Sequence, residues 1–387
     1  MRLAERMGRL GTESAFVVLA KAKAMEAQGR DIIHLEIGEP DFITPAPIID
    51  AAYRYLKEGH THYCPSAGLA ELREAICRYF SRTRGVSYEP DEVVVGPGAK
   101  PFLYYVIMAL AQEGDEVIYP NPGFPVYESV ANFAGARPVP LPILEERGFR
   151  FGVDELRELV TERTRLVILN YPHNPTGGTL NREELAALAE IAVEHDIIVL
   201  ADEVYSHMLY EGQHVSIATF PGMRERTVLM DSHSKLYAMT GWRLGWVATN
   251  RELASQLTNL ITNSVSCTPP FIQLAGRDAL EGPQDDSRAM TEEFRRRRDF
   301  FIKGLNDLPG VSCRMPDGAF YAFPNVRALP PSCEEVADLL LEEAGVATLP
   351  GTAFGRYGEG PLRLCFANSM ERLGQALERM AQAFRKL

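Results

Sequence analysis

Lysine is scarce in this sequence. The 387-residue chain has seven lysines against 33 arginines, so arginine is its ordinary cation. Lys235 stands out because it follows the apolar run 227–230 and ends the hydroxyl-rich segment Ser232–Lys235. A guanidinium stays protonated, whereas an amine can lose its proton and form a Schiff base with a carbonyl. The sequence therefore predicts chemistry that needs the amine of Lys235, with Lys100 as the only serious rival.

The sequence also lacks the features of nucleic-acid-binding, metal-binding and membrane proteins. A formal net charge of −12 argues against a nucleic-acid partner, which would require a basic face. The six cysteines are scattered without zinc or redox spacing, so we expect reduced thiols and no metal site. The apolar stretch 15–20 is too short for a signal segment or a membrane span. We therefore expect a cytoplasmic protein with no membrane partner.

What the sequence does contain is an alternation of short apolar runs with amphipathic helical patterns. The runs are continuous rather than alternating, which is typical of strands covered on both faces. With helices between them, they predict an α/β fold with a mainly parallel sheet. The expected strands are 93–95, 116–119, 166–169, 197–201, 228–230 and 245–248.

The pattern changes after about Pro283, which suggests a second, smaller domain. A long charged helix is expected over 287–307, followed by a strand-like stretch at 317–323. We therefore predict a large ligand-binding domain over 41–285 and a small α+β domain over 286–387. Residues 1–40 are expected to form an N-terminal arm and to complete the small domain.

Polar residues gather where the predicted strands end. Ligands of open α/β sheets bind at the carboxyl ends of the strands, so five polar strand ends are a stronger signal than any one of them. These segments are 96–100, 121–124, 170–174, 202–205 and 232–235.

These segments offer the groups that a Schiff-base cofactor such as pyridoxal phosphate requires. Lys235 supplies the amine, and Asp202 could pair with the pyridine nitrogen, although it could also cap a helix. Tyr205 could reach the ring oxygen or be a core tyrosine. Asn174 lies between two prolines, where it could donate to the ring oxygen or only shape a turn.

An anion site and a carboxylate clamp complete the set. The segment Gly98-Ala99-Lys100 precedes a helix, whose N-terminal N–H groups can hold a phosphate, and Arg243 could pair with that phosphate. Phe124 could stack on the ring or belong to the core. Arg363, inside an apolar run, suits either a bidentate clamp for a carboxylate or a buried ion pair.

Taken together, the chain resembles the class I/II aminotransferases of pyridoxal-phosphate fold type I. The resemblance runs from Glu36 to Arg363 and rests on the segments Asn-Pro-Thr-Gly, Asp-Glu-Val-Tyr, Ser-x-Ser-Lys and Gly-Trp-Arg-Leu-Gly, which occur in the family's order and spacing. It implies a large domain with a mainly parallel sheet sandwiched by helices, a smaller α+β domain, and transfer of an amino group from an amino acid to a 2-oxo acid.

The resemblance also implies a role for each candidate residue. Lys235 would carry pyridoxal 5'-phosphate and later move the proton. Asp202 would pair with the ring nitrogen, Asn174 and Tyr205 with the ring oxygen, and Phe124 would stack. The phosphate would lie among Gly98, Ala99, Lys100, Ser232 and Arg243, and the substrate carboxylate between Arg363, Asn174 and the Gly38 backbone. Tyr63 would reach the phosphate of a neighbouring subunit, so a homodimer with shared active sites is expected.

The substrate is expected to be acidic. A lysine at the place of Lys100 faces the second carboxylate of the substrate in a group of bacterial aspartate aminotransferases that the chain resembles. The alternative is an aromatic or aliphatic substrate, with Phe16, Phe42 and Tyr127 lining an apolar pocket. A β-lyase or an oxidase on the same fold also stays open, because the fold does not fix the fate of the carbanion. A DNA-binding sensor is disfavoured by the acidic charge.

Overall fold

The computed structural model describes residues 2–11 and 13–387, and within these residues the strands form three sheets of seven, three and two strands. The large sheet has the order β2-β8-β7-β6-β5-β3-β4. Its strands are β2 (Val93–Gly96), β3 (Glu116–Asn121), β4 (Arg137–Pro142), β5 (Thr164–Asn170), β6 (Ile198–Asp202), β7 (Thr227–Ser232) and β8 (Gly245–Ala248).

The large sheet confirms the predicted α/β class. Neighbouring strands from β7 to β4 are parallel, and β8 is antiparallel to both β2 and β7. The sequence analysis missed β4, which carries prolines at Pro138, Pro140 and Pro142 and pairs only with β3 at the edge. Proline lacks the backbone N–H that an inner strand needs for hydrogen bonds to its two neighbours. An edge strand tolerates prolines, so its sequence can resemble that of a loop.

Helices cover both faces of the large sheet, and each face has its own apolar core. One face packs against α2 (Ala46–Lys57), α3 (Ala70–Arg84), α6 (Val153–Leu159), α7 (Arg182–Glu194) and α10 (Pro270–Glu281). The other packs against α4 (Lys100–Leu110), α5 (Val126–Ala134) and α9 (Arg251–Ser264). The short α8 (His233–Leu236) follows β7 directly. Burial on both faces explains why the strands read as continuous apolar runs.

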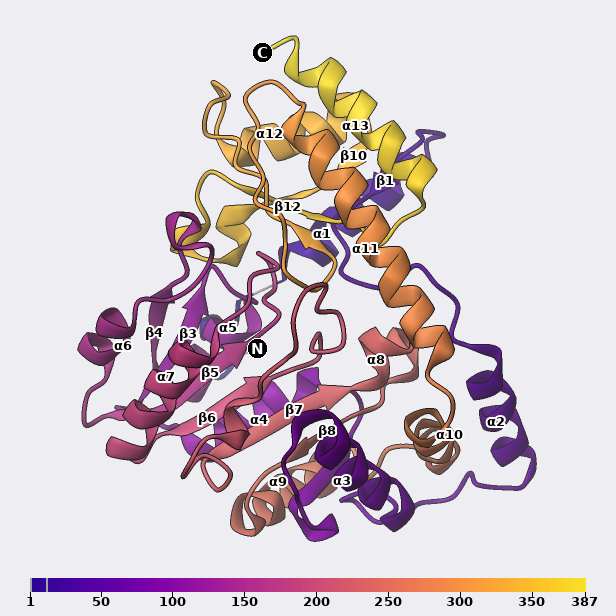
Figure 1. Ribbon diagram of the computed structural model, residues 1–387, viewed down its shortest axis with the longest axis vertical. Helices are drawn as coiled ribbons and strands as arrows, with labels where there is room; N and C mark the ends of the chain where they lie inside the picture. The colour runs from indigo at the N-terminus through magenta and orange to yellow at the C-terminus, as the bar shows by residue number, and fades with distance from the viewer. Residues whose placement is uncertain (1, 12) are drawn as a thin grey trace.

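A separate apolar core lies around the C-terminal elements. In Figure 1, the long α11 runs from α10 to this part of the molecule, where α12 and α13 lie. Its elements are α1 (Ser14–Glu26), β1 (Ile33–His34), α11 (Asp285–Asn306), β9 (Tyr321–Ala322), α12 (Cys333–Leu339), the π-helical turn η6 (Leu340–Ala344), β10 (Val346–Ala347), β11 (Leu349–Pro350), β12 (Leu362–Cys365) and α13 (Met370–Phe384).

The N-terminal segment reaches into this C-terminal part. β1 pairs in parallel with β10, so that Ile33 lies opposite Val346. The strand expected over 317–323 is shorter, because only β9 is regular there. The division into domains at residues 40 and 285 stays a prediction.

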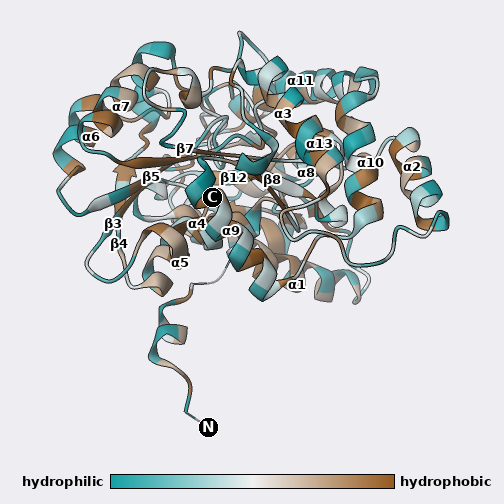
Figure 2. Ribbon diagram, turned by 90° about the horizontal axis from the view of Figure 1, so that it is seen from below, coloured by the Kyte–Doolittle hydropathy of each residue, from teal (hydrophilic) through white to brown (hydrophobic). Residues whose placement is uncertain are grey.

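The N-terminal segment projects from the body of the molecule (Figure 2), and its turn η1 (Glu5–Arg9) lies against α5. Within residues 2–11 and 13–387, no helix is long and apolar enough to cross a membrane.

Candidate active site

A cavity of about 590 Å³ opens at the carboxyl ends of β5, β6 and β7. It lies where a ligand site is expected in an open α/β sheet. Most of the predicted site residues line it, although they come from widely separated parts of the sequence. They are Gly38, Ala99, Lys100, Phe124, Asn174, Asp202, Tyr205, Ser232, Lys235, Arg243 and Arg363.

The amine of Lys235 lies inside this cavity. Lys235 belongs to α8, and its Nζ donates a hydrogen bond of 2.5 Å to the backbone oxygen of Gly38. Burial lowers the pKa of Lys235 to about 8, so a sizeable fraction of this amine is neutral near physiological pH. The rival Lys100 has a half-exposed side chain in an ion pair with Glu13. Of the two lysines, Lys235 is the better nucleophile.

Asp202 ends β6 and is almost fully buried. Tyr127 of α5 donates a hydrogen bond of 2.9 Å to its Oδ2, whereas its buried Oδ1 has no partner among the described residues. Burial raises the pKa of Asp202 to about 7. A buried carboxylate oxygen without a partner is costly, and a cationic ring N–H in the cavity would satisfy it. This polar role of Tyr127 could not be predicted from the sequence.

Two asparagines shape the neighbouring wall. Asn170 ends β5, donates 3.0 Å to the backbone oxygen of Asp202, and accepts 2.9 Å from the backbone N–H of Asn174. The buried Oδ1 of Asn174 has no partner in the described part of the chain. Asn170 therefore holds the turn that presents Asn174 to the cavity.

Tyr205 also lines the cavity, and the segment that carries it forms a turn. Its hydroxyl lies 2.7 Å from the hydroxyl of Tyr321 in β9. The sequence analysis missed Tyr321, because only the tertiary fold brings the C-terminal part of the chain over the end of β6. A Cβ atom at Gly38 would collide with the Tyr321 hydroxyl, so a side chain cannot fit there.

One end of the cavity offers an anion site. Ala99, which directly precedes α4, and Lys100, its first residue, line the cavity together with Ser232 and Arg243. Gly98 does not line the cavity, but it has a φ of +94° and a Cβ atom at this position would collide with the Arg243 guanidinium. Glycine is the residue that tolerates this backbone conformation. Gly98 thus shapes the anion site from behind.

Arg363 on β12 provides a second cation. Its side chain is buried, it donates to the backbone oxygen of Glu36, and its guanidinium carbon lies 4.8 Å from the ring centroid of Tyr321. Among the described residues Arg363 forms no salt bridge, and its Nε has no hydrogen-bond partner. The alternative of a buried ion pair is therefore wrong for these residues. A buried guanidinium without an anion suits a ligand carboxylate.

Of the three aromatic residues that were expected to line an apolar pocket, Phe16 and Tyr127 line the cavity, and so does Phe124. Phe42 does not line it, because its ring packs edge-on against Phe294 in the C-terminal core at 5.2 Å. Tyr63 is outside the cavity as well, with 89% of the residue exposed.

Lys100 has two kinds of neighbour that the sequence analysis did not identify. Its Nζ pairs with the carboxylate of Glu13, just before α1, and lies 5.4 Å from the ring centroid of Phe124 and 5.7 Å from that of Phe16. Glu13 also lines the cavity. No spacing pattern links residues 13 and 100, so this pair could not be predicted from the sequence.

The geometry defines a class of enzyme: an α/β protein with a buried amine, an unsatisfied buried carboxylate and an anion site around one cavity. This set fits pyridoxal 5'-phosphate, because the amine, the pyridine nitrogen and the phosphate each find a partner. No cluster of three or more side chains able to hold a metal ion occurs in the described residues.

Comparison with known proteins identifies the family. Residues 30–380 match the family described as aminotransferase class I and II. An aspartate aminotransferase of Bacillus subtilis is 40% identical, covering 100% of both chains. An arginine–pyruvate transaminase of Pseudomonas aeruginosa is 42% identical, covering 95% of this chain and 94% of the other. The crystal structure of an aspartate aminotransferase from Rhizobium meliloti superposes with a TM-score of 0.96 at 36% identity, covering 100% of both chains.

The chain therefore belongs to the class I and II aminotransferases. It has fold type I, its activity is that of a transaminase, and its cofactor is pyridoxal 5'-phosphate. The family resemblance, the fold class and the cofactor predicted from the sequence are confirmed.

Proposed function

We propose that this aminotransferase takes the amino group of an acidic L-amino acid, aspartate or glutamate, and passes it to a 2-oxo acid such as 2-oxoglutarate. The observation that carries the proposal is the distribution of cations in the cavity. Lys235 is the amine for the cofactor and Arg243 suits its phosphate. Among the described residues that line the cavity, Arg363 and Lys100 remain. Two further cations match a substrate with two carboxylates.

The cofactor would be held by the residues that the sequence analysis named. Lys235 would be its attachment point, and Asp202, which accepts a hydrogen bond from Tyr127, would pair with the ring nitrogen. Asn174 and Tyr205 would bind the ring oxygen, and Phe124 would stack on the ring. Arg243, the Ser232 hydroxyl and the backbone N–H groups at the start of α4 would hold the phosphate.

When bound, pyridoxal phosphate supplies an electron sink for the charge that develops at the α-carbon of the substrate. The chain supplies the proton chemistry. The neutral Nζ of Lys235 takes the proton from the substrate α-carbon, and its lowered pKa increases the neutral fraction of the amine. Arg363 binds the α-carboxylate through a fork that fits its two oxygens, which orients the α-proton toward Lys235.

A second candidate is a neutral or aromatic donor, and one observation favours it. Glu13 already pairs with Lys100, so a second substrate carboxylate would have to displace a resident one. Phe16 and Phe124 beside the pair would then form an apolar wall. The relatives themselves differ, since one is named as an arginine–pyruvate transaminase and one solved neighbour is titled as an aromatic aminotransferase.

A substrate panel with two variants separates these candidates. Steady-state kcat/KM is measured for aspartate, alanine and phenylalanine with 2-oxoglutarate in the wild type, Lys100→Met and Glu13→Gln. For an acidic donor, Lys100→Met lowers kcat/KM for aspartate about tenfold or more and leaves alanine nearly unchanged. Glu13→Gln raises kcat/KM for aspartate because Lys100 is released. Equal losses for aspartate and alanine in Lys100→Met would rule out the acidic reading.

We further propose a homodimer in which each subunit completes the site of the other. Support comes from apolar exposure: Tyr63 is 89% and Ile43 84% exposed, and Leu3, Met7 and Leu10 are exposed on the N-terminal segment that projects in Figure 2. Such apolar surface is typical of an interface.

Subunit mixing tests this assembly. Tyr63→Ala and Lys235→Ala would each lower activity alone. Mixed dimers would regain activity, because one of their two sites has both native residues. Sedimentation as a monomer, or no recovery after unfolding and refolding the variants together, would contradict the shared site.

A further inference from the structure

A buried ionic cluster lies directly behind the cavity, on the other face of the large sheet. Side chains along a strand alternate between faces, and Asp202 and Ser232 line the cavity. Their neighbours Glu203 and Asp231 are also buried, with 4% and 2% of each residue exposed. Because Asp202 pairs with Met230 in register, Glu203 and Asp231 lie on the same far face. Asp202 is thus followed by the buried carboxylate of Glu203, and Ser232 is preceded by the buried carboxylate of Asp231.

One guanidinium joins these two carboxylates. Arg84 is the last residue of α3, and its side chain is 2% exposed. Its Nε donates to Oε2 of Glu203 at 2.7 Å, and its Nη2 donates to Oδ2 of Asp231 at 2.8 Å. The two bonds reach the ends of two different strands, so Arg84 fixes the end of β6 relative to the end of β7.

The Asp231 branch of the cluster leads to the active-site turn. Tyr79 of α3 donates 2.9 Å to the same Oδ2 that Arg84 contacts. The other oxygen, Oδ1, accepts the backbone N–H of Ser232 at 2.7 Å. Ser232 directly precedes α8, the helix that carries Lys235. The chain of bonds therefore runs from Arg84 through Asp231 to the beginning of the segment that carries the reactive amine.

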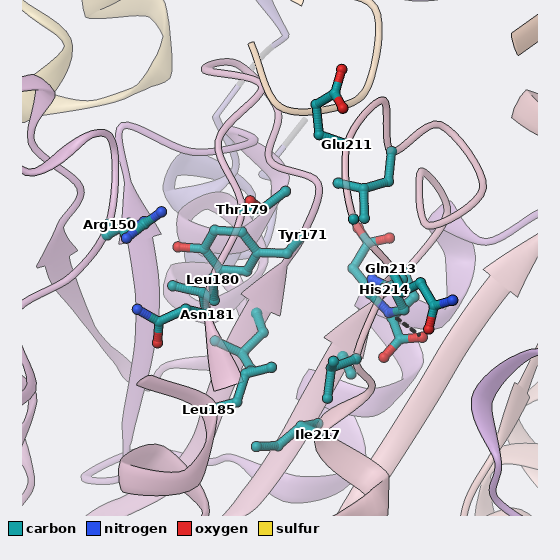
Figure 3. A pocket seen from close by; sticks show the side chains of 17 residues that line it. Arg150, Tyr171, Thr179, Leu180, Asn181, Leu185, Glu211, Gln213, His214 and Ile217 are labelled. Carbon is teal, nitrogen blue, oxygen red and sulfur yellow. Dashed lines mark ion pairs between the residues drawn. The ribbon is translucent and has the colours of Figure 1, made fainter. Parts of the chain in front are cut away.

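The Glu203 branch leads to a loop. His214 places its Nε2 2.9 Å from the Oε2 of Glu203, and both residues line a second pocket, separate from the active-site cavity, that Figure 3 shows. His207 lies 3.4 Å from Nη1 of Arg84 and also contacts Tyr79. Burial lowers the pKa of His207 to about 3, so this ring is neutral.

The charges of the cluster act on Asp202. Burial alone would raise the pKa of Glu203, but His214 and Arg84 lower it to about 2. Burial raises the pKa of Asp231 to about 6, although Arg84 opposes the shift. Burial also raises the pKa of Asp202, and the charge of Asp231 adds to that rise. Without the guanidinium, the charge of Asp231 would lack its buried counter-charge and would disfavour the charged form of Asp202 more strongly.

We propose that Arg84 is a positioning residue of the transamination site, whose guanidinium holds Glu203 and Asp231 so that Asp202 stays ionised and Ser232 stays in place. The proposal rests on the role of Asp202 at the ring nitrogen of the cofactor. On the cavity side, Asp202 interacts with the Tyr127 hydroxyl from α5, the Lys235 amine from α8 and Tyr205, and replacing Arg84 changes none of these groups.

The test compares Arg84→Met with Arg82→Met, which removes an exposed charge from the same turn of α3. Each protein is purified with its cofactor bound, and the absorbance of the bound cofactor is measured as a function of pH. The dissociation constant of pyridoxal phosphate, kcat and KM for aspartate are then measured. For Arg84→Met we expect a shifted pH titration, an affinity for the cofactor about tenfold weaker, and a lower kcat with little change in KM, because one pKa unit at Asp202 corresponds to a factor of ten. Arg82→Met keeps the wild-type values.

A double variant distinguishes a positioning role of Arg84 from a general contribution of Arg84 to the stability of the protein. In Arg84→Met/Glu203→Gln the guanidinium and one carboxylate are both removed, so we expect the pH titration and the cofactor affinity to recover toward the wild type. A role in folding alone would lower the melting temperature without this recovery. If Arg84→Met does not fold, Arg84→Lys and Asp231→Asn take its place, and wild-type titrations in both variants would overturn the proposal.

The outcome is separable from that of the proposed function. Wild-type protein that forms no 2-oxo acid from any amino donor contradicts the proposed function. Arg84→Met with wild-type cofactor affinity, titration and kcat contradicts only the role of Arg84.

Discussion

Tyr127 and Asp202 are joined across two layers of the molecule by a hydrogen bond of 2.9 Å, from the tyrosine hydroxyl in α5 to the carboxylate that ends β6. Both residues are buried. The bond lowers the pKa of Asp202, against the stronger effect of burial, which raises it to about 7. This donor therefore helps to keep a carboxylate charged at the place where the cofactor ring nitrogen would bind.

Replacing Tyr127 with Phe removes this donor and keeps the ring. The pKa of Asp202 then rises, and a larger fraction of Asp202 is neutral at pH 7. A hydrogen bond to a charged group contributes about 1.5–3 kcal/mol, so we expect the dissociation constant of pyridoxal phosphate to increase about tenfold or more. Fluorescence titration of the apoenzyme measures it. An unchanged dissociation constant would show that the Tyr127 hydroxyl does not support Asp202.

The lowered pKa of Lys235 predicts how cofactor attachment depends on pH. Burial lowers this pKa to about 8, and only the neutral amine can attack the aldehyde of the cofactor. Below pH 8 the rate of reconstitution of the apoenzyme should rise about tenfold per pH unit, and above it the rate should level off. Stopped-flow absorbance measures the rate. A midpoint near the ordinary lysine value would mean that the amine is not desolvated before the cofactor arrives.

Arg363 and Lys100 should fail in different ways. Arg363→Met removes the partner of the carboxylate that all amino acids share, so KM should rise about 10- to 100-fold for aspartate and for alanine alike. Lys100→Met should affect aspartate alone. Initial rates with both donors in both variants give the comparison. If Arg363→Met raised KM for aspartate but not for alanine, Arg363 would bind the side-chain carboxylate and not the α-carboxylate, which would contradict the proposed role.

The apoenzyme should lose stability in acid because of its buried histidines. Burial lowers the pKa of His173 to about 3, below the ordinary value of 6.5. Between these two values the unfolded chain binds a proton that the folded chain does not, so stability falls as the pH drops below about 6.5, by about 1.4 kcal/mol per pH unit. Melting curves of the wild type and of His173→Asn should converge as the pH falls from 7 to 5. Replacement of the exposed His195 is the control. Parallel curves would place the acid sensitivity elsewhere.

The sequence predicted the strand ends well, for a physical reason. Strands buried on both faces read as continuous apolar runs, and the polar residues that follow them meet at one edge of the sheet. Asp202, Asn174, Ser232 and Lys235 were all found in this way. The proline-rich β4 was missed because an edge strand does not need the pattern of an inner one.

The contacts that the sequence could not predict are those between distant segments. Tyr321 reaches Tyr205 from β9, and Glu13 reaches Lys100 from the start of α1. Each has an ordinary local pattern, and only the tertiary fold gives it a place in the cavity. The expectation that Phe42 lines the pocket was wrong for the same reason. Phe42 is close in sequence to the cavity residue Gly38, but its ring packs against Phe294.

The most direct test of the account is a half-reaction without an acceptor. Purified protein loaded with pyridoxal phosphate is mixed with L-aspartate, and oxaloacetate, ammonia and the absorbance of the bound cofactor are followed together. The account predicts about one equivalent of oxaloacetate per active site, a single change in the cofactor absorbance, no ammonia, and no reaction in Lys235→Ala. Repeated turnover with release of ammonia, or no oxaloacetate while phenylalanine or alanine reacts, would contradict it.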